Sequence, residues 1–191
     1  AASFSPWVGS QTLVVSVLAG KTVGNLTARL PQAERIVRAM PNLPASVMRG
    51  MTGCYAAPAV SGAQREMAQR LLEAVGAVEW VAKEHLIDSV TAVSGSGPAY
   101  VFLLVECLTK AGMQEGLPEA VAAKLARTTI EGAGELLRQS DLSPATLRQN
   151  VTSPAGTTAA ALEVLMAPDG LEPLMQRAVR AARLRAEALS G

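Results

Sequence analysis

The segment 153–158, with the sequence SPAGTT, combines residue types that can bind a small anion. Ser153 is a suitable helix N-cap, and Pro154 suits the first helical position because an N–H there has no helical partner. Gly156 has no side chain to keep an anion at a distance. The first N–H groups of a helix are unpaired and carry the positive end of its dipole. We therefore expect this segment to hold a carboxylate.

Two threonines extend this predicted site. Thr157 and Thr158 add hydroxyls that can donate to or accept from a ring nitrogen beside the carboxylate. The other interpretation is an ordinary helix start that happens to contain small residues, because Ser-Pro is common there. The residue types alone leave both interpretations open.

Few other residues offer chemistry. The single histidine, His85, lies in the connector AKEHLID and is predicted to be a solvated or capping residue rather than a catalytic acid. Cys54 and Cys107 are far apart and form no CxxC pair, so they are predicted to be free, buried thiols. No metal site is expected.

The first half of the chain alternates strand and helix patterns. Apolar, β-branched runs predict strands, and amphipathic runs between them predict helices. The predicted strands are 12–20, 35–40, 50–58 and 77–82, and the predicted helices are 21–30 and 61–76, the second capped by Ser61. This order indicates a parallel α/β sheet with right-handed crossovers.

After about Lys83 the pattern is helical only. We expect a mostly buried helix over 84–116 with an interruption at Gly97 and Pro98. An amphipathic helix follows Pro118, and a short helix capped by Ser143 precedes two final helices. The apolar stripe expected on the helix after Pro118 consists of Val121, Leu125, Thr129, Ala133 and Leu136 or Leu137.

The apolar helix over 99–108 is too apolar to be covered by so few neighbouring helices. Each buried Val, Leu or Phe contributes about 1.5 to 3 kcal/mol. The pattern therefore predicts homodimerisation through the helical half.

The composition excludes several classes of protein. A formal charge of +1, with 17% charged residues, gives no field that favours nucleic acid. The longest nearly uncharged apolar run, 99–108, is about half of what a bilayer span needs, and residues 1–11 lack a signal-peptide pattern. We expect a cytoplasmic protein that binds neither nucleic acid nor membrane.

No glycine-rich phosphate turn occurs in the chain. A dinucleotide-binding sheet uses GxGxxG between a strand and a helix, with an acidic residue about 20 positions later. The nearest candidate, SGSGPAY from Ser94, has the wrong spacing and no preceding strand. It is predicted to be the start of a helix.

Three segments carry a resemblance to a known family. They are RAMPNLPASVMRGMTG from Arg38, TAVSGSGPAYVFLLVECLTKAGMQEGL from Thr91 and LRQNVTSPAGTTAAALEVL from Leu147. Together they resemble pyrroline-5-carboxylate reductase, in the same order and over essentially the whole chain. The resemblance implies that residues 1–84 are the C-terminal part of a dinucleotide-binding, Rossmann-type parallel sheet domain without its glycine-rich first half. Residues 85–191 would be an all-helical dimerisation and substrate domain, in a homodimer that in this family often builds rings of dimers.

The resemblance also implies an activity and a site. The enzyme would pass a hydride from NADPH or NADH to the C=N carbon of 1-pyrroline-5-carboxylate, giving L-proline. The loop that would hold the substrate carboxylate consists of Ser153, Pro154, Ala155, Gly156, Thr157 and Thr158. Thr158 would reach the ring nitrogen as the catalytic residue, and Asp141 would approach the site from the neighbouring subunit.

Two turns would border the nicotinamide by the same resemblance. One contains Ala19 and Gly20, and the other contains Asn42 and Pro44. Family members usually have Thr where this sequence has Leu43.

Alternatives remain open at this point. About two βαβ units, of roughly 30 residues each, are lacking ahead of residue 1, and we expect the chain to be part of a longer enzyme rather than an inactive truncated product. Rival functions are a non-catalytic helical dimerisation module with a small-anion pocket, or a related imine or β-hydroxyacid reductase. Such a reductase would place lysine or aspartate in the interdomain helix, where this sequence has Glu106 and Lys110. Preference for NADH or NADPH, oligomer size and feedback regulation are not set by these residues.

Overall fold

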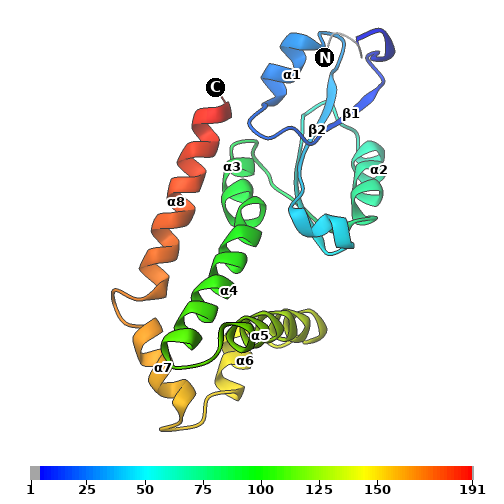
Figure 1. Cartoon of the computed structure of the whole chain (residues 1–191). Helices are drawn as coiled ribbons and strands as arrows, with labels where there is room; N and C mark the ends of the chain where they lie inside the picture. Colours follow the sequence, from blue (N-terminus) through cyan, green and yellow to red (C-terminus); the bar gives the residue numbers. More distant parts are fainter. Residues whose placement is uncertain (1–4, 191) are drawn as a thin grey trace. The chain divides into compact units, whose positions relative to one another are not determined.

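The computed structural model describes residues 5–190, which form two compact units. The first unit contains the residues up to Pro98 together with those from Ala178 on, and the second is Ala99–Arg177. Residues 1–4 of the N-terminal stretch used for the signal-peptide prediction lie outside the described residues. Figure 1 traces the chain, and each unit is described by itself.

The first unit is built on a four-stranded sheet in the order β1-β2-β3-β4. The strands are β1 (Leu13–Ser16), β2 (Arg35–Met40), β3 (Gly50–Ala56) and β4 (Gly76–Trp80). A 3-10 turn, η1 (Ser5–Trp7), precedes them, α1 (Val23–Arg29) joins β1 to β2, and α2 (Gly62–Glu73) joins β3 to β4. Both helices begin with a capping box, at Thr22 and at Ser61. All four strands and both helices lie where the sequence predicts them.

The sheet is mixed rather than parallel throughout. β1 and β2 are parallel, β3 and β4 are parallel, but β2 and β3 are antiparallel, with Val37 opposite Ala56. The connection between β2 and β3 contains only the short 3-10 helix η2 (Leu43–Val47). A parallel crossover needs about a dozen residues or more. The prediction of parallel neighbours is therefore confirmed for the two strand-helix-strand units and wrong for the step between them, and the right-handed sense of the crossovers stays a prediction.

β2 is the most buried strand of the sheet. Ile36 and Val37 are fully buried, and they point to opposite faces because successive side chains in a strand alternate. Ile36 packs with Leu26 and Leu30 of α1 and its C-cap, whereas Val37 clusters with residues of α2. The two helices therefore cover opposite faces of the sheet.

One long helical run begins in the first unit. It consists of α3 (Leu86–Val90), a π-helical turn, η3 (Thr91–Gly95), and α4 (Gly97–Gln114). The predicted interruption at Gly97 and Pro98 thus lies at the π turn, just before them. The run Leu86–Gln114 has 29 residues and contains an 18-residue window with a mean hydropathy of 1.3, so by length and composition it could cross a membrane. The ten-residue apolar stretch considered in the sequence is therefore part of a longer apolar helix.

α4 is exposed in the single chain, so the prediction of a mostly buried helix is wrong at this level. None of its residues is buried, and Phe102 and Leu103 are 55% and 56% exposed. The sequence pattern correctly indicates an apolar helix, but the neighbouring helices of one chain cover little of it. An apolar helix that its own chain leaves uncovered is the feature on which the prediction of homodimerisation rests.

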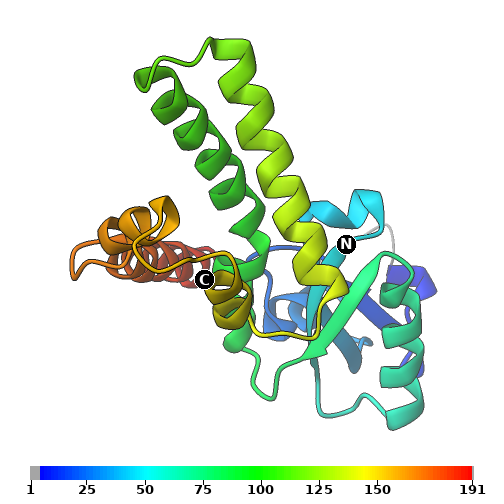
Figure 2. The same cartoon turned by 90° about the horizontal axis from the view of Figure 1, so that it is seen from below.

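The second unit is entirely helical, as predicted. It contains most of α4, followed by α5 (Glu119–Gln139), α6 (Pro144–Asn150), α7 (Thr157–Leu165) and the start of α8 (Leu171–Ser190), which continues into the first unit. Figure 2 shows α4 and α5 side by side, and a Cβ placed on Gly112 of α4 would lie 3.2 Å from Cβ of Ala122 of α5.

The buried face of α5 differs from the predicted stripe. Ala122 and Ala126 are buried, whereas Val121 and Leu125 are 45% and 52% exposed. Small residues allow α4 and α5 to approach closely, so the larger side chains of the predicted stripe remain on the surface of the single chain.

Candidate functional site

The segment before α7 forms a tight turn rather than the first turn of the helix. The amide of Gly156 donates to the carbonyl oxygen of Ser153 at 3.1 Å, and Ala155 has a φ of 55°. Proline at the second position and a positive φ at the third are the pattern of a type II turn. Gly156 is the N-cap of α7 and no side chain caps the helix. The prediction that Ser153 is the N-cap is therefore wrong, because Pro154 begins a turn instead of a helix.

The unpaired amides predicted for this segment lie a few residues further along the chain. The first helical hydrogen bond of α7 runs from Ala160 N to Gly156 O at 3.2 Å. Within the part of the chain that the structure describes, the amides of Thr157, Thr158 and Ala159 have no acceptor. They carry the positive end of the helix dipole, and the turn before them is exposed. This geometry can bind a carboxylate.

Gly156 lies close to Ser153, so a side chain there would crowd the turn. A Cβ at position 156 would collide with Ser153 Oγ and would lie 3.1 Å from Ser153 O. Ala155 holds a left-handed conformation that a non-glycine residue adopts only at a cost of about 1 kcal/mol or more. The backbone conformation of this segment is therefore constrained. Residues 153–159 are called the mouth of α7 below.

The residues predicted to border a nicotinamide lie in two turns of the first unit. Ala19 and Gly20 follow β1, and Asn42 and Pro44 follow β2. Because β1 and β2 are parallel neighbours, both turns leave the sheet at the same edge. The carboxyl edge of such strands is where α/β proteins bind their ligands. Gly20 has a φ of 67°, and a Cβ there would lie 3.0 Å from Leu189 O, so glycine is required.

The side chain of Asn42 is engaged within the chain. Its Nδ2 donates to Ser94 O at 3.3 Å and to Ser94 Oγ at 3.2 Å, and its Oδ1 accepts from Met51 N at 2.8 Å. The Ser94 carbonyl lacks an α-helical donor because Pro98 has no N–H. Asn42 thus ties the loop after β2 to the π turn. No local sequence pattern signals this role.

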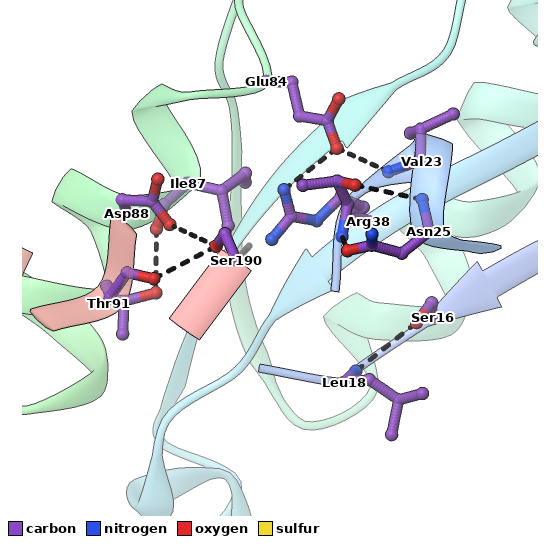
Figure 3. Close-up of polar contacts among 12 residues, drawn as sticks. Ser16, Leu18, Val23, Asn25, Arg38, Glu84, Ile87, Asp88, Thr91 and Ser190 are labelled. Atoms are coloured by element: carbon purple, nitrogen blue, oxygen red, sulfur yellow. Dashed lines mark hydrogen bonds and ion pairs between the residues drawn. The ribbon is translucent and has the colours of Figure 1, made fainter. Parts of the chain in front are cut away.

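An ion pair between a buried arginine and a partly buried glutamate lies next to the turn that follows β1 (Figure 3). Nη1 of Arg38, a residue that is only 4% exposed, lies 2.9 Å from Oε1 of Glu84. The same oxygen accepts a hydrogen bond from Val23 N at 2.6 Å. An arginine inside the apolar strand RIVRAM signals a buried charge that needs a partner. No local pattern identifies a partner 46 positions away.

The remaining candidate residues show no catalytic arrangement. His85 is exposed and makes no side-chain cap, and Asp141 is exposed in the connector between α5 and α6. Residues 5–190 contain no group of three or more side chains suited to a metal ion.

Both cysteines are free, as predicted, but only Cys54 is buried. Burial raises its pKa to about 12, an effect that the nearby Arg65 slightly opposes. Cys107 lies on the uncovered helix α4 and is exposed, so its predicted burial is wrong for the single chain.

The predicted site residues fall into two groups. The substrate group, 153–158 with Asp141, belongs to the second unit, and the nicotinamide group belongs to the first. Within each unit the structure brings the members of the loop or of the sheet edge together. The assignment of these residues to substrate and cofactor remains a prediction.

The fold and the site together define a class: an α/β domain with candidate ligand turns at one edge of the sheet, followed by a helical domain with an apolar surface. The family described as pyrroline-5-carboxylate reductase dimerisation matches residues 84–189. The chain is also 44% identical, over 98% of its length, to the pyrroline-5-carboxylate reductase of Pseudomonas aeruginosa. It belongs to the pyrroline-5-carboxylate reductase family.

Further relatives agree with this assignment. The chain is 43% identical to the enzyme of Synechocystis over 94% of its length. A solved structure from Coxiella burnetii superposes with a TM-score of 0.91 at 41% identity, covering 99% of this chain and 70% of that one. The Plasmodium falciparum enzyme, solved with NADP bound, gives a TM-score of 0.83 at 30% identity, covering 99% of this chain and 75% of that one.

The chain is shorter than these relatives. It spans 68% of the Pseudomonas aeruginosa enzyme, 66% of the Synechocystis enzyme and 62% of the Pasteurella multocida enzyme.

The matched dimerisation region includes the apolar helices α4 and α5. A partner subunit accounts for their exposed apolar side chains more directly than a membrane does.

Proposed function

We propose that this chain carries the substrate site and the nicotinamide edge of an enzyme that reduces 1-pyrroline-5-carboxylate to L-proline. The observation that carries the proposal is the set of acceptor-free amides at the mouth of α7. They follow directly on a constrained loop in the segment that most resembles the family. The NADP-bound relative from Plasmodium falciparum supports NADPH or NADH as the reductant.

The α7 mouth would hold the substrate by its carboxylate. The amides of Thr157, Thr158 and Ala159 point out of the helix start and meet a negative charge favourably. The hydroxyl of Thr158, which is partly buried, would then lie beside the ring nitrogen. This differs from the sequence-based assignment, because Pro154 has no N–H and the amide of Gly156 already bonds to Ser153.

Positioning would do most of the catalytic work. When bound, NADPH or NADH would supply the hydride that the C=N carbon accepts, and the imine nitrogen would take its proton from water. The protein residues fix the ring in one orientation, which is worth several kcal/mol in reactions of this kind. No strong protein acid is needed. This agrees with the position of His85, which is exposed and whose side chain makes no capping hydrogen bond to α3.

The nicotinamide would lie along the two turns that follow β1 and β2. Ala19 and Gly20 form one side, and the backbone near Asn42 and Pro44 forms the other. A glycine-rich phosphate turn does not occur in the sequence 1–191. The proposal therefore concerns the nicotinamide end of the cofactor only.

The other assignments complete the proposal. We place the functional division at residues 84 and 85, which agrees with the start of the matched dimerisation family at residue 84. Asp141 would approach the substrate site of the neighbouring subunit. The curated relatives are named as pyrroline-5-carboxylate reductases, and we propose a cytoplasmic setting for this protein.

Reductase activity tests the proposal directly. The full-length gene product, mixed with pyrroline-5-carboxylate and NADPH, should oxidise the cofactor, followed by its absorbance, and yield proline. Binding of L-proline should be detected by calorimetry, whereas pyrrolidine, which has the ring but no carboxylate, should not bind. Proline binding without cofactor oxidation would indicate a non-catalytic anion-binding module. Oxidation with a different imine or hydroxyacid, and none with pyrroline-5-carboxylate, would indicate a related reductase.

A further inference from the structure

The start of α1 is held by a carboxylate from a distant part of the chain. Thr22 and Asn25 form a capping box, with both of its hydrogen bonds at 3.0 Å. The next amide, Val23 N, donates to Oε1 of Glu84 at 2.6 Å. The first turn of α1 contains no acidic residue of its own. Glu84 therefore supplies the negative charge that favours a helix N-terminus.

Arg38 fixes the position of that carboxylate. Its guanidinium is almost completely buried in the sheet, and Nη1 lies 2.9 Å from the same Oε1 atom of Glu84. A buried arginine is costly unless it is paired, so the pair holds Glu84 in one place. Through this one oxygen, strand β2, helix α1 and the connector before α3 are joined, as Figure 3 shows.

The turn between β1 and α1 ends at the amide that Glu84 holds. The turn begins after Ser16, whose hydroxyl accepts from Leu18 N at 3.4 Å, and it ends at the capping box. Near its middle, Gly20 packs against Leu189, from the part of α8 that belongs to the same unit. Within the described residues, the amides of Ala19 and Gly20 donate no hydrogen bond. The turn is thus fixed at its two ends, and its two central amides are available to donate hydrogen bonds.

We propose that Glu84 is a positioning residue for the turn between β1 and α1, which is one of the two turns predicted to border the nicotinamide. Its carboxylate is engaged by Arg38 and by Val23 N, and it acts by holding Val23 N so that the turn stays at the carboxyl edge of β1. This inference rests on the proposed function, which places the nicotinamide against that turn. Loss of the Glu84 acceptor should weaken cofactor binding and leave substrate binding unchanged.

Two double variants separate this role from the stability of the ion pair. Arg38→Met with Glu84→Gln, and Arg38→Met with Glu84→Leu, both remove the charges, so neither leaves a buried unpaired arginine. Only the glutamine variant keeps an oxygen that can accept from Val23 N. In the full-length gene product, the leucine variant should raise the KM and the Kd for NADPH about fivefold to tenfold over the glutamine variant, the effect of removing one hydrogen bond. The KM for pyrroline-5-carboxylate should be the same in both to within about twofold.

A matched control and a second measurement complete the test. Glu66→Gln changes an exposed glutamate on α2 and should leave every constant unchanged. Amide hydrogen exchange at Val23 should be faster in the leucine variant than in the glutamine variant. Equal NADPH constants in the two double variants, or loss of affinity in proportion to loss of melting temperature, would overturn the inference. A parent protein that binds NADPH but does not reduce pyrroline-5-carboxylate would refute the proposed function instead, and the NADPH Kd would still decide the role of Glu84.

Discussion

Thr158 is the side chain on which the proposed chemistry depends most. It occupies the second position of α7, is partly buried, and its hydroxyl makes no hydrogen bond within the described chain. Removing the hydroxyl in Thr158→Ala should lower kcat about tenfold or more, as expected when a hydrogen bond is removed from a desolvated site. Steady-state kinetics with pyrroline-5-carboxylate measures this.

Two further substitutions give this test its controls. Thr158→Ser keeps the hydroxyl and should retain most of the activity. Thr157→Ala removes the neighbouring, exposed hydroxyl and should have a smaller effect than Thr158→Ala. Equal kinetics in Thr158→Ala and the parent would exclude Thr158 from the mechanism.

Cys54 makes the stability of the protein depend on pH in the alkaline range. Burial raises its pKa from 9.0 to about 12, so the folded state keeps the proton over a range in which the unfolded state loses it. Its contribution is complete below pH 9 and is lost as the pH rises toward about 12. The contribution of Cys54 to the free energy of unfolding should fall by up to about 1.4 kcal/mol for each pH unit in this range.

The variant Cys54→Ala isolates this contribution. It loses some core packing at every pH, but its stability should fall less steeply above pH 9 because no thiol ionises. Urea unfolding of parent and variant at about pH 8 and about pH 10 gives the comparison. Parallel pH profiles for the two proteins would show that Cys54 ionises equally in the folded and unfolded states.

At the residue scale, the loop could be located from the sequence, whereas the long-range hydrogen bonds could not. The residue types of 153–158 were sufficient to single out the segment before α7, because small residues, proline and glycine have local conformational effects, but they did not decide between an anion site and an ordinary helix start. The partners of Arg38 and Asn42 could not be predicted. Glu84 is 46 positions from Arg38 and Ser94 is 52 from Asn42, and such pairings follow from the tertiary fold alone.

At the scale of elements, the periodicity of apolar residues predicted where the strands lie in the sequence but not whether neighbouring strands run parallel or antiparallel. β2 and β3 both have the apolar pattern of buried strands, and this pattern is the same for parallel and antiparallel neighbours. The short connection at η2 was the available signal, since it has no room for a crossover. The start of α7 was misplaced for a related reason: Ser-Pro begins either a helix or a turn, and only the positive φ of Ala155 distinguishes them.

A side chain at position 156 should disturb the turn before α7. In Gly156→Ala the new Cβ would meet Ser153 Oγ and lie 3.1 Å from Ser153 O, so the turn before the helix must shift. The amides of Thr157 and Thr158 would move with it. The affinity for L-proline, measured by calorimetry, should fall about tenfold or more, in line with the sensitivity of anion sites to donor geometry.

The matched control is a glycine with free space around it. Gly132 lies inside α5, and a Cβ there would meet no atom within 4 Å. Gly132→Ala should leave proline binding unchanged and stabilise the helix by up to about 1 kcal/mol. If Gly156→Ala bound proline as tightly as Gly132→Ala, the α7 mouth would not be the carboxylate site.

At the scale of the whole molecule, the single chain leaves an apolar surface that needs a partner. Large apolar side chains are exposed along two helices: Val101, Phe102, Leu103, Leu104 and Leu108 on α4, and Val121, Leu125, Leu136 and Leu137 on α5. Monomeric proteins rarely expose apolar patches of this extent. The matched family region, 84–189, is a dimerisation region and includes both helices. The apolar run 99–108 predicts homodimerisation from the sequence alone, because the hydrophobicity of a segment does not depend on knowing the fold.

A charge placed on this surface should separate the subunits. Leu103 of α4 is 56% exposed in the single chain, and Leu103→Asp would bury a carboxylate in an interface between α4 helices. Removing the buried leucine side chain costs about 1.5 to 3 kcal/mol, and desolvation of the carboxylate adds to this, so dimer affinity should fall at least about a hundredfold. Leu71→Asp on α2, where the parent residue is 65% exposed, places the same charge outside the matched region. In sedimentation velocity at micromolar concentration, the parent and Leu71→Asp should be dimers and Leu103→Asp a folded monomer. A parent that sediments as a folded monomer at that concentration would contradict the prediction, because the apolar face of α4 would then be stable in water without a partner.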